Sequence, residues 1–326
     1  MHQDLLSRLR CPGCGWSLRL DPACPADEVE EGTLLCRACG ARFPIHGHVP
    51  RFVFPTEKPD HFGVQWNLFP GTQLDSVSGQ PISRDRFLRF TGWKPDELRG
   101  RDVLDVGCGA GRFSEVVLSF GARVVALDNT SAVDACWHNL GPRTGLDVVQ
   151  GDVYRLPFVP ESFDFVYCLG VLQHTPDARQ AFLALARQLK KGGRLAVDLY
   201  PRLWLSVLWP KYWLRLVTRR LSPRALHALV SRVFPILYPV SQALGRMPLA
   251  GRKLRYAVPV ANYEGVLPLA PTQLREWAFL DTLDMLGPRY DQPQRLETLR
   301  HWFEEAGLSD IRVSRMGHLV GTACRR

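Results

Sequence analysis

Short apolar runs separated by longer mixed segments dominate the chain between residues 100 and 200. Runs that are apolar throughout are typical of strands buried on both faces of a parallel sheet, because a strand buried on one face alternates apolar and polar residues. The segments between the runs have room for crossover helices. The pattern predicts an α/β domain with a doubly wound sheet, whose first five strands cover these residues: 103–106, 123–127, 148–150, 163–169 and 194–198.

The same pattern returns near the C-terminus. Leu296, Leu299, Trp302 and Phe303 are spaced as one face of a helix, which Gly307 ends. Two strand-like runs follow, and they would complete a seven-stranded sheet: 310–314 and 318–324.

Residues 201–256 show neither pattern. Five prolines after Pro201 interrupt this segment, and a proline inside a helix removes a backbone hydrogen bond, so we expect several short helices rather than one long one. The prolines are Pro210, Pro223, Pro235, Pro239 and Pro248.

The first apolar run leads directly into three alternating glycines, Gly107, Gly109 and Gly111. Without a Cβ atom, glycine lets the backbone turn tightly and approach a ligand closely. A dinucleotide-binding fold has the spacing G-x-G-x-x-G, which would place its last glycine at Arg112. The observed spacing therefore argues against NAD.

Acidic residues follow the next two strands. Asp128 comes about 20 residues after Gly107, where a carboxylate can accept hydrogen bonds from both ribose hydroxyls of a nucleoside. Asp152 ends the third strand, where it can accept a hydrogen bond from an adenine amino group. The glycine turn and the two acids together predict a nucleoside site at the carboxyl edge of the sheet.

This order of elements resembles the class I S-adenosylmethionine-dependent methyltransferases, whose first motif runs V-L-D-x-G-C-G-x-G. The resemblance covers residues 100–200 and resumes at 294–326, with K-x-G-G before the fifth strand. It implies a Rossmann-like sheet and S-adenosylmethionine as methyl donor; a dinucleotide-binding or ligand-free doubly wound domain is the alternative. The residues that it places at the donor are Trp66, Gln73, Asp105, Gly107, Gly109, Gly111, Asp128, Asn129, Asp152, Val153 and Leu169.

The segment after the fourth strand bears on the acceptor. Gly170-Val171-Leu172-Gln173-His174 resembles enzymes that methylate quinones, sugars and other small metabolites, so we expect a small-molecule, glycan or lipid-linked acceptor. RNA is the second candidate, although the D/N/S-P-P-Y/F/W motif of base-nitrogen methyltransferases is missing there, and no proline precedes Cys168. A non-enzymatic donor-binding partner protein is the third.

An oxygen acceptor needs a base, and His174 is placed for this role by its pKa and its position. A structural histidine at the start of a helix is the equally simple interpretation.

Two C-x2-C-G turns near the N-terminus predict a structural zinc site. Their thiolates, from Cys11, Cys14, Cys36 and Cys39, would complete a closed tetrahedral site. A segment this small has little core of its own, so we expect it to fold with its metal. Free or redox-active cysteines are the alternative. The other cysteine in this segment, Cys24, falls outside the pattern.

Residues 41–50, after the second turn, are similar to the last strand of the small zinc-ribbon proteins that activate RNA and protein methyltransferases. The likeness covers roughly residues 5–55 and implies a docking or stabilising module. We expect His46 and His48 to be loop residues, since four thiolates already satisfy zinc.

The positive charge of the chain is local. The formal net charge is +9, yet residues 201–256 contain eleven Lys and Arg and no Asp or Glu, leaving 30 basic against 32 acidic residues elsewhere. This basic segment is interleaved with tryptophan and tyrosine. It favours either a helical lid over the substrate, a lid that also contacts a membrane surface, or a nucleic-acid contact.

Asp281 and Asp284 share one face of a predicted helix, and we expect this face to be solvated, with a polyhydroxylated substrate as the alternative partner. The N-terminus has no secretory signal and no apolar stretch is long enough to span a bilayer, so we expect a cytoplasmic protein, with peripheral membrane contact through 201–256 as a further expectation. The predicted divisions are a zinc ribbon (1–55), a linker with donor-capping helices (56–100), the donor-binding core (101–200), the basic helical insertion (201–293) and the closing elements (294–326).

Overall fold

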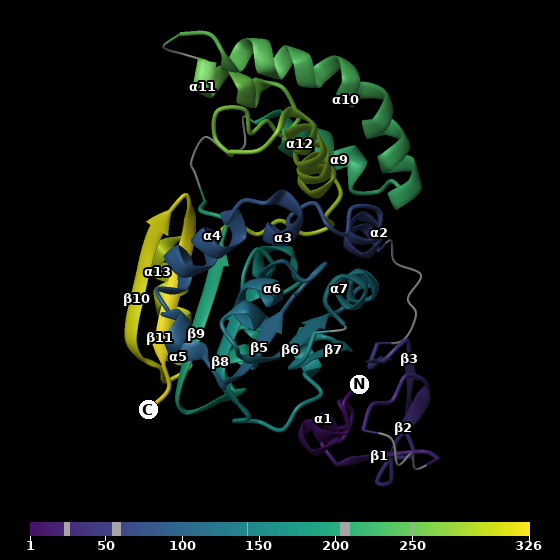
Figure 1. The fold of residues 1–326 in the computed structure, drawn as a ribbon. Helices are drawn as coiled ribbons and strands as arrows, with labels where there is room; N and C mark the ends of the chain where they lie inside the picture. Colours follow the sequence, from purple (N-terminus) through teal and green to yellow (C-terminus); the bar gives the residue numbers. More distant parts are fainter. Residues whose placement is uncertain (23–26, 54–59, 142, 203–208, 249–250) are drawn as a thin grey trace.

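A seven-stranded sheet forms the centre of the molecule (Figure 1). The computed structural model describes residues 1–22, 27–53, 60–141, 143–202, 209–248 and 251–326. The strand order is β10-β11-β9-β8-β5-β6-β7, and only β11 runs antiparallel to both of its neighbours among these strands. The predicted doubly wound α/β sheet is confirmed. Its strands are β5 (Asp102–Val106), β6 (Arg123–Asp128), β7 (Leu146–Gln150), β8 (Phe163–Cys168), β9 (Leu189–Leu199), β10 (Ser309–Met316) and β11 (His318–Cys324).

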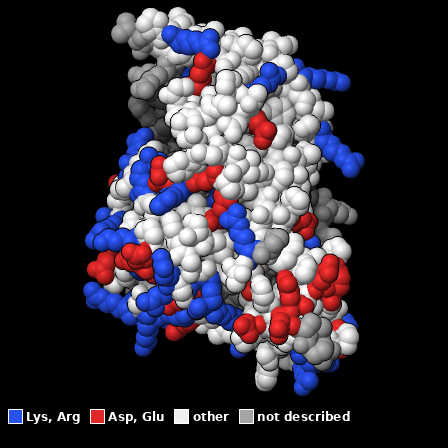
Figure 2. All heavy atoms as spheres, viewed as in Figure 1, with Lys and Arg blue, Asp and Glu red and all other residues white. Residues whose placement is uncertain are grey.

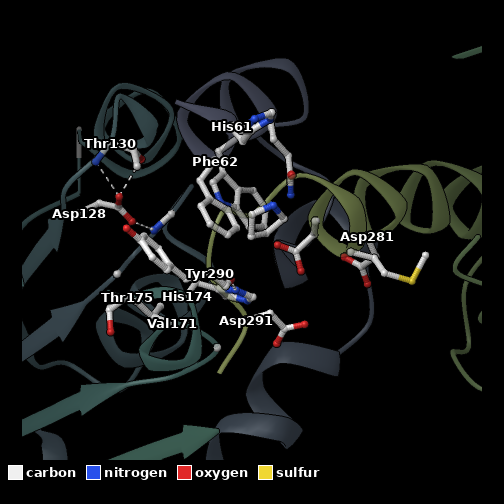
Figure 3. Close-up of a pocket in the computed structure, with 18 of the residues that line it drawn as sticks. His61, Phe62, Asp128, Thr130, Val171, His174, Thr175, Asp281, Tyr290 and Asp291 are labelled. Carbon is white, nitrogen blue, oxygen red and sulfur yellow. Dashed lines mark hydrogen bonds between the residues drawn. The ribbon is translucent and has the colours of Figure 1, made fainter. Parts of the chain in front are cut away.

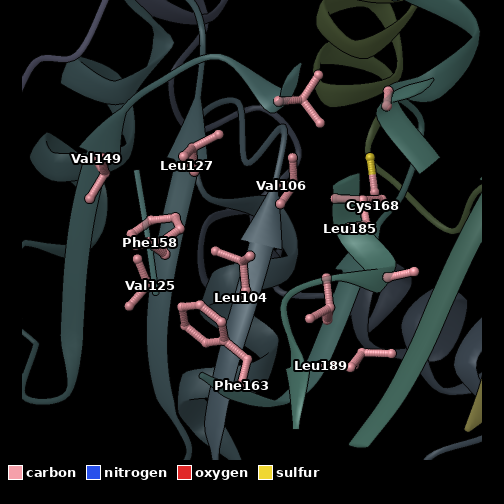
Figure 4. Packing of buried hydrophobic residues seen from close by; sticks show 14 of the residues in the cluster. Leu104, Val106, Val125, Leu127, Val149, Phe158, Phe163, Cys168, Leu185 and Leu189 are labelled. Carbon is pink, nitrogen blue, oxygen red and sulfur yellow. The ribbon is translucent and has the colours of Figure 1, made fainter. Parts of the chain in front are cut away.

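Successive residues of the strands face opposite sides of the sheet, which produces two apolar layers. Leu104 and Val106 of β5 pack on one side with the helices α8 and α13 (Figure 4), whereas Val103 packs on the other side with α4, α6 and α7. The helices around the sheet are α2 (His61–Leu68), α3 (Asp75–Ser78), α4 (Ile82–Thr91), α5 (Pro95–Leu98), α6 (Arg112–Ser119), α7 (Ala132–Leu140), α8 (Ala178–Ala186) and α13 (Leu296–Glu305).

The N-terminal segment forms a separate four-stranded antiparallel sheet in the order β1-β2-β3-β4. Strands β1 and β2 pair antiparallel, with Leu18 opposite Cys36. The loop prediction for His46 is wrong, because it is the last residue of β3, while His48 stacks on Trp137 with ring centroids 4.6 Å apart. Cys24 lies outside the described residues. The elements are α1 (Gln3–Arg8), β1 (Leu18–Leu20), β2 (Gly32–Cys36), β3 (Arg42–His46) and β4 (Val49–Pro50).

This N-terminal segment contacts the sheet at several places, and two of these involve arginine side chains. Past β4, the Phe52 N–H donates a 2.8 Å hydrogen bond to the Gln150 carbonyl of the edge strand β7, and Arg51 bonds to Asp134 at 2.6 Å. At the other place, Arg8 donates to the buried Asp102 carboxylate at 2.7 Å. Burial alone would raise the pKa of Asp102, but hydrogen bonds from Arg123, Arg8 and Lys190 lower it to about 2.

A lid of four helices covers the carboxyl ends of the central strands (Figure 1). The prediction of short helices is wrong for α10, which continues through Pro235 and Pro239. Both prolines lie on its exposed side, where the carbonyls that lose their partners can bond to water. Among the described residues, no helix is both long and apolar enough to cross a membrane. The lid helices are α9 (Pro210–Thr218), α10 (Pro223–Gly245), α11 (Gly251–Leu254) and α12 (Pro271–Leu286).

Candidate active site

One cavity of about 1850 Å³ lies between the carboxyl ends of the strands and the lid. In Figure 3, Asp128 lies at one side of this cavity and Asp281 at the other, with Phe62 and His174 between them. The cavity therefore connects the predicted donor site with the underside of the lid.

The glycine turn forms the wall at the donor side. Gly107 has a φ of +81°, and a Cβ there would lie 2.3 Å from a methyl group of Val171. Gly109 has a φ of +53°, and a Cβ there would lie 3.1 Å from the indole of Trp66. The turn thus needs glycine both for its backbone conformation and for the close approach of these side chains.

Asp128 is held at the end of β6 by its own neighbours. The Gly109 N–H donates to one carboxylate oxygen at 3.0 Å, while the backbone N–H and hydroxyl of Thr130 donate to the other at 2.9 and 2.7 Å. Burial raises the pKa of Asp128, although these hydrogen bonds oppose the shift. The carboxylate therefore has a fixed orientation at the cavity wall before any ligand binds.

The structure brings most of the other predicted donor residues to the same cavity. Asp152 lines it and accepts a hydrogen bond from the Tyr154 N–H at 3.0 Å. Gln73 also lines it, but beneath the lid, where its amide bonds to Asp281 and Arg112. The remaining predicted residues on the wall are Trp66, Asn129, Val153 and Leu169.

Two predicted donor residues are not among the described residues that line the cavity. The Asp105 carboxylate is buried behind the turn and accepts a 2.6 Å hydrogen bond from the Ser114 hydroxyl; burial raises its pKa to about 7. Gly111 has a φ of +92°, and a Cβ there would lie 2.6 Å from Leu140, so its role here is packing.

His174 lies in the short 3₁₀ helix Leu172–His174 with its ring in the cavity. Its Nδ1 is 3.0 Å from the Tyr290 carbonyl, and since a carbonyl only accepts, Nδ1 carries the proton. Nε2 then holds a lone pair, and it is buried without a hydrogen-bond partner in the described part of the chain. Burial lowers the pKa of His174, which keeps the imidazole neutral.

The lid side of the cavity is acidic, and the prediction of a solvated face for Asp281 and Asp284 is wrong, because both line the cavity. Asp281 accepts hydrogen bonds from the Tyr263 hydroxyl and from Trp277 Nε1. Burial raises the pKa of each of the two carboxyls to about 6.

Three functional candidates were not found from the sequence, namely Tyr290, Lys211 and Asp291. Lys211 Nζ lies 3.9 Å from an Asp291 oxygen, and both groups line the cavity. The return of acids after an acid-free segment was a usable signal for Asp291. No sequence signal marks the Tyr290 carbonyl.

The four predicted metal ligands come together in the N-terminal segment, with all of their sulfurs within 4.8 Å of one another. The sulfurs of Cys11 and Cys39 are 3.6 Å apart, and those of Cys14 and Cys36 are 3.4 Å apart. A tetrahedral zinc ion with Zn–S bonds of about 2.3 Å requires sulfur separations of about 3.8 Å. The cluster is thus compatible with zinc.

Comparison with known proteins agrees with this geometry. Residues 104–197 match the family described as "Methyltransferase domain". A ubiquinone biosynthesis O-methyltransferase of Pseudomonas entomophila is 33% identical over 129 residues, which are 37% of this chain and 56% of that protein; the Xylella fastidiosa enzyme of the same name is 35% identical over 129 residues. The chain thus spans about half the length of these curated relatives.

Among solved structures, the complex of the Haloferax volcanii Trm112 methyltransferase activator with a putative methyltransferase matches with a TM-score of 0.46 and 12% identity, over 82% of this chain and 99% of that one. The match to the methyltransferase family covers residues 104–197, so the central sheet with its glycine turn is a methyltransferase domain of the class I, S-adenosylmethionine-dependent type.

Proposed function

We propose that this protein transfers a methyl group from S-adenosylmethionine to a hydroxyl oxygen of a small molecule. The observation that carries the proposal is the free Nε2 of His174, which lies in the same cavity as the glycine turn. The relatives are named as O-methyltransferases of ubiquinone biosynthesis, which supports an oxygen acceptor.

The donor would lie over the backbone of Gly107 and Gly109. Val171 and Trp66 approach these two residues so closely that a side chain on either would not fit. Asp128 would accept hydrogen bonds from the ribose, Asp152 would face the adenine, and Trp66 would cover the donor. When bound, the donor supplies an electrophilic methyl group on a positively charged sulfur. The contribution of the protein is to align the acceptor with this methyl group and to exclude water, because the reaction is an in-line displacement.

His174 would remove the acceptor proton. Its neutral Nε2 accepts the proton as the oxygen attacks, and the Tyr290 carbonyl holds the Nδ1–H throughout, which fixes the ring and stabilises the resulting imidazolium. The charge of nearby Asp291 also favours the protonated form. The acidic lid side of the cavity, with Asp281 and Asp284, suits an acceptor with further hydroxyl groups; such acceptors include quinols, glycans and lipid-linked sugars.

The proposal is tested by S-adenosylhomocysteine release against a panel of phenols, sugars and cell-extract fractions. In His174→Asn the amide nitrogen replaces Nδ1 and keeps the bond to Tyr290, while the base is lost. We expect the rate to fall by a factor of about 10² to 10⁴. Donor affinity, measured by calorimetry, should be unchanged. An unchanged rate in His174→Asn would refute the role of the base, and an absence of donor binding to folded protein would refute the methyltransferase proposal. Release that depends on RNA fractions would favour the RNA alternative.

We further propose that Cys11, Cys14, Cys36 and Cys39 hold a structural zinc ion. Chelation should release one metal ion per chain and expose residues 1–53 to hydrogen exchange, because closed thiolate sites stabilise folds of this size. Cys11→Ser should do the same, whereas Cys324→Ser, outside the cluster, should retain the metal. Metal analysis that finds no zinc in protein purified without chelators would contradict this assignment.

A further inference from the structure

Helix α9 in the lid is oriented with its polar side toward the protein. Lys211, Arg215 and Thr218, which are spaced as one helical face, point inward. Arg215 and Thr218 are each only 6% exposed. The Arg215 guanidinium donates to the carbonyls of Met285 and Pro288 at 3.1 and 2.7 Å, and the Thr218 hydroxyl donates to the Leu286 carbonyl at 2.8 Å. These bonds satisfy carbonyls at the end of α12 and fix the orientation of α9.

The opposite side of α9 is apolar and uncovered. Trp213, Leu216 and Val217 are 64%, 51% and 65% exposed, and their spacing of three and four residues makes them one continuous stripe. Arg220 lies two turns after Trp213, just past the end of α9, and is also exposed. We call Trp213, Leu216, Val217 and Arg220 the outer α9 stripe. A continuous apolar stripe is unfavourable on a surface that contacts only water, so the outer α9 stripe indicates an interaction site.

The neighbouring helix α10 has the same property. It buries Leu226, Val230 and Phe234 against the rest of the lid, yet Ile236 and Val240 on its outward side are 69% and 46% exposed. Helix α10 therefore also leaves apolar side chains uncovered, beside the exposed Ser231 and Arg232. In Figure 2 the part of the surface formed by the lid is mostly uncharged, with scattered basic side chains and few acidic ones.

Charge identifies the partner. Residues 201–256 carry eleven cations and no acid. Lys211 and Arg215 point inward, but others are exposed on the lid, so a partner must tolerate or attract positive charge; the exposed ones include Arg219, Arg220, Arg224 and Arg232. A second copy docking through the same face would set these cations against one another. A nucleic acid would satisfy the cations but would leave Trp213, Leu216 and Val217 against phosphates and water. An anionic lipid surface satisfies both, because tryptophan prefers the interface and arginine reaches the headgroups.

We propose that α9 docks this protein on an anionic lipid bilayer through the outer α9 stripe. The stripe adjoins the cavity, because Arg219 and Arg220 line it, as do the stacked rings of Trp209 and Tyr256. Docking therefore brings the mouth of the cavity to the lipid surface, where a membrane-embedded acceptor can enter. The lipid contact itself does not rest on the proposed methyl transfer.

The test is flotation of the zinc-replete, full-length chain with two kinds of vesicle, in the absence of donor and acceptor. One contains phosphatidylcholine alone, and the other contains phosphatidylcholine with phosphatidylglycerol. We expect binding to the anionic vesicles only, weakening as salt increases. Leu216→Glu/Val217→Glu should lower the partition coefficient at least about tenfold, and Arg220→Gln should lower it about fivefold.

The matched control is Trp16→Glu/Val77→Glu, which places the same charges at exposed apolar positions outside the lid and should bind like the wild type. Circular dichroism confirms that each variant is folded. Failure of the wild type to bind anionic vesicles overturns the proposal, as does equal binding by Leu216→Glu/Val217→Glu. A dimer that dissociates in this variant, seen by light scattering, would assign the stripe to a second copy instead. Loss of co-purifying RNA in the variant would assign it to nucleic acid.

Discussion

Helices α13 and α9 are similar in length and both amphipathic, yet they bury opposite kinds of side chain. Helix α13 packs Leu299, Trp302 and Phe303 against the sheet and exposes Glu304. Helix α9 buries Arg215 and exposes its apolar side. Periodicity thus predicts a helix and its two faces, while the surroundings decide which face points inward. The sheet offers α13 an apolar layer, whereas the end of α12 offers α9 unpaired carbonyls.

The largest expected effect is at the buried face of α13. Phe303 is fully buried and fills the space beside Gly321, where a Cβ would lie 2.3 Å from its ring. Phe303→Ala should lower the free energy of unfolding by about 3–5 kcal/mol, because it removes apolar contacts and leaves a cavity. Urea denaturation measures this, with Arg300→Ala on the exposed side of the same helix as control. A loss below about 1 kcal/mol would mean that α13 is not packed as described.

The second-largest effect on stability should come from substitutions in the buried polar face of α9. Arg215→Met keeps the volume but leaves the Met285 and Pro288 carbonyls without their donor, at a cost of about 2–3 kcal/mol. We expect this loss of stability to appear as faster hydrogen exchange in α9 and at the end of α12, while the exchange rates in the central sheet stay unchanged. Arg224→Met, an exposed arginine of α10, serves as the control. Equal exchange in both variants would show that Arg215 does not anchor α9.

The contributions of Asp284 in the lid and Asp102 in the central sheet to the free energy of unfolding should change with pH in opposite directions. Burial raises the pKa of Asp284 to about 6, with Lys211 opposing the shift and Asp291 adding to it. Its contribution to stability is therefore full below about pH 4 and is lost as pH rises through about 6. Asp284→Asn should raise the free energy of unfolding by about 1–2 kcal/mol at pH 8 and change it little at pH 4.

Asp102 in the central sheet behaves in the opposite way, because its pKa is lowered to about 2. Its paired carboxylate stabilises the fold above about pH 4, and this contribution is lost as pH falls through about 2. Asp102→Asn should therefore destabilise at pH 8. Thermal unfolding at the two pH values measures both variants, and the same sign for both would contradict the assignment of their environments.

The smallest effect should come from the exposed face of α9. Trp213→Ala should change the free energy of unfolding by no more than about 0.5 kcal/mol in the absence of lipid, because the indole is 64% exposed. A loss of several kcal/mol in urea denaturation would show that a contact within the chain covers this side chain.

Local chemistry made the donor side of the cavity predictable. Gly107 and Asp128 lie where a strand ends, and the backbone turn and the acid follow from residues close in the sequence. Asp281 and Asp284 were placed on one face correctly, but whether the face meets water depends on the packing of the lid. The partner of His174 was not predictable, because the Tyr290 carbonyl is 116 residues away. The continuation of α10 through Pro235 was missed because proline breaks a helix only where the lost bonds have no other partner.

The contact of Phe52 with β7 has a consequence for the behaviour of the protein in a crowded cell. Strand β7 is an outer strand of the sheet, and an outer strand with free N–H and carbonyl groups can recruit a strand from another molecule. The backbone of Phe52 occupies one of these groups, and Arg51 pairs beside it with Gln150. The N-terminal segment thus covers this part of the edge of β7 and leaves fewer free backbone groups there for a strand from another molecule.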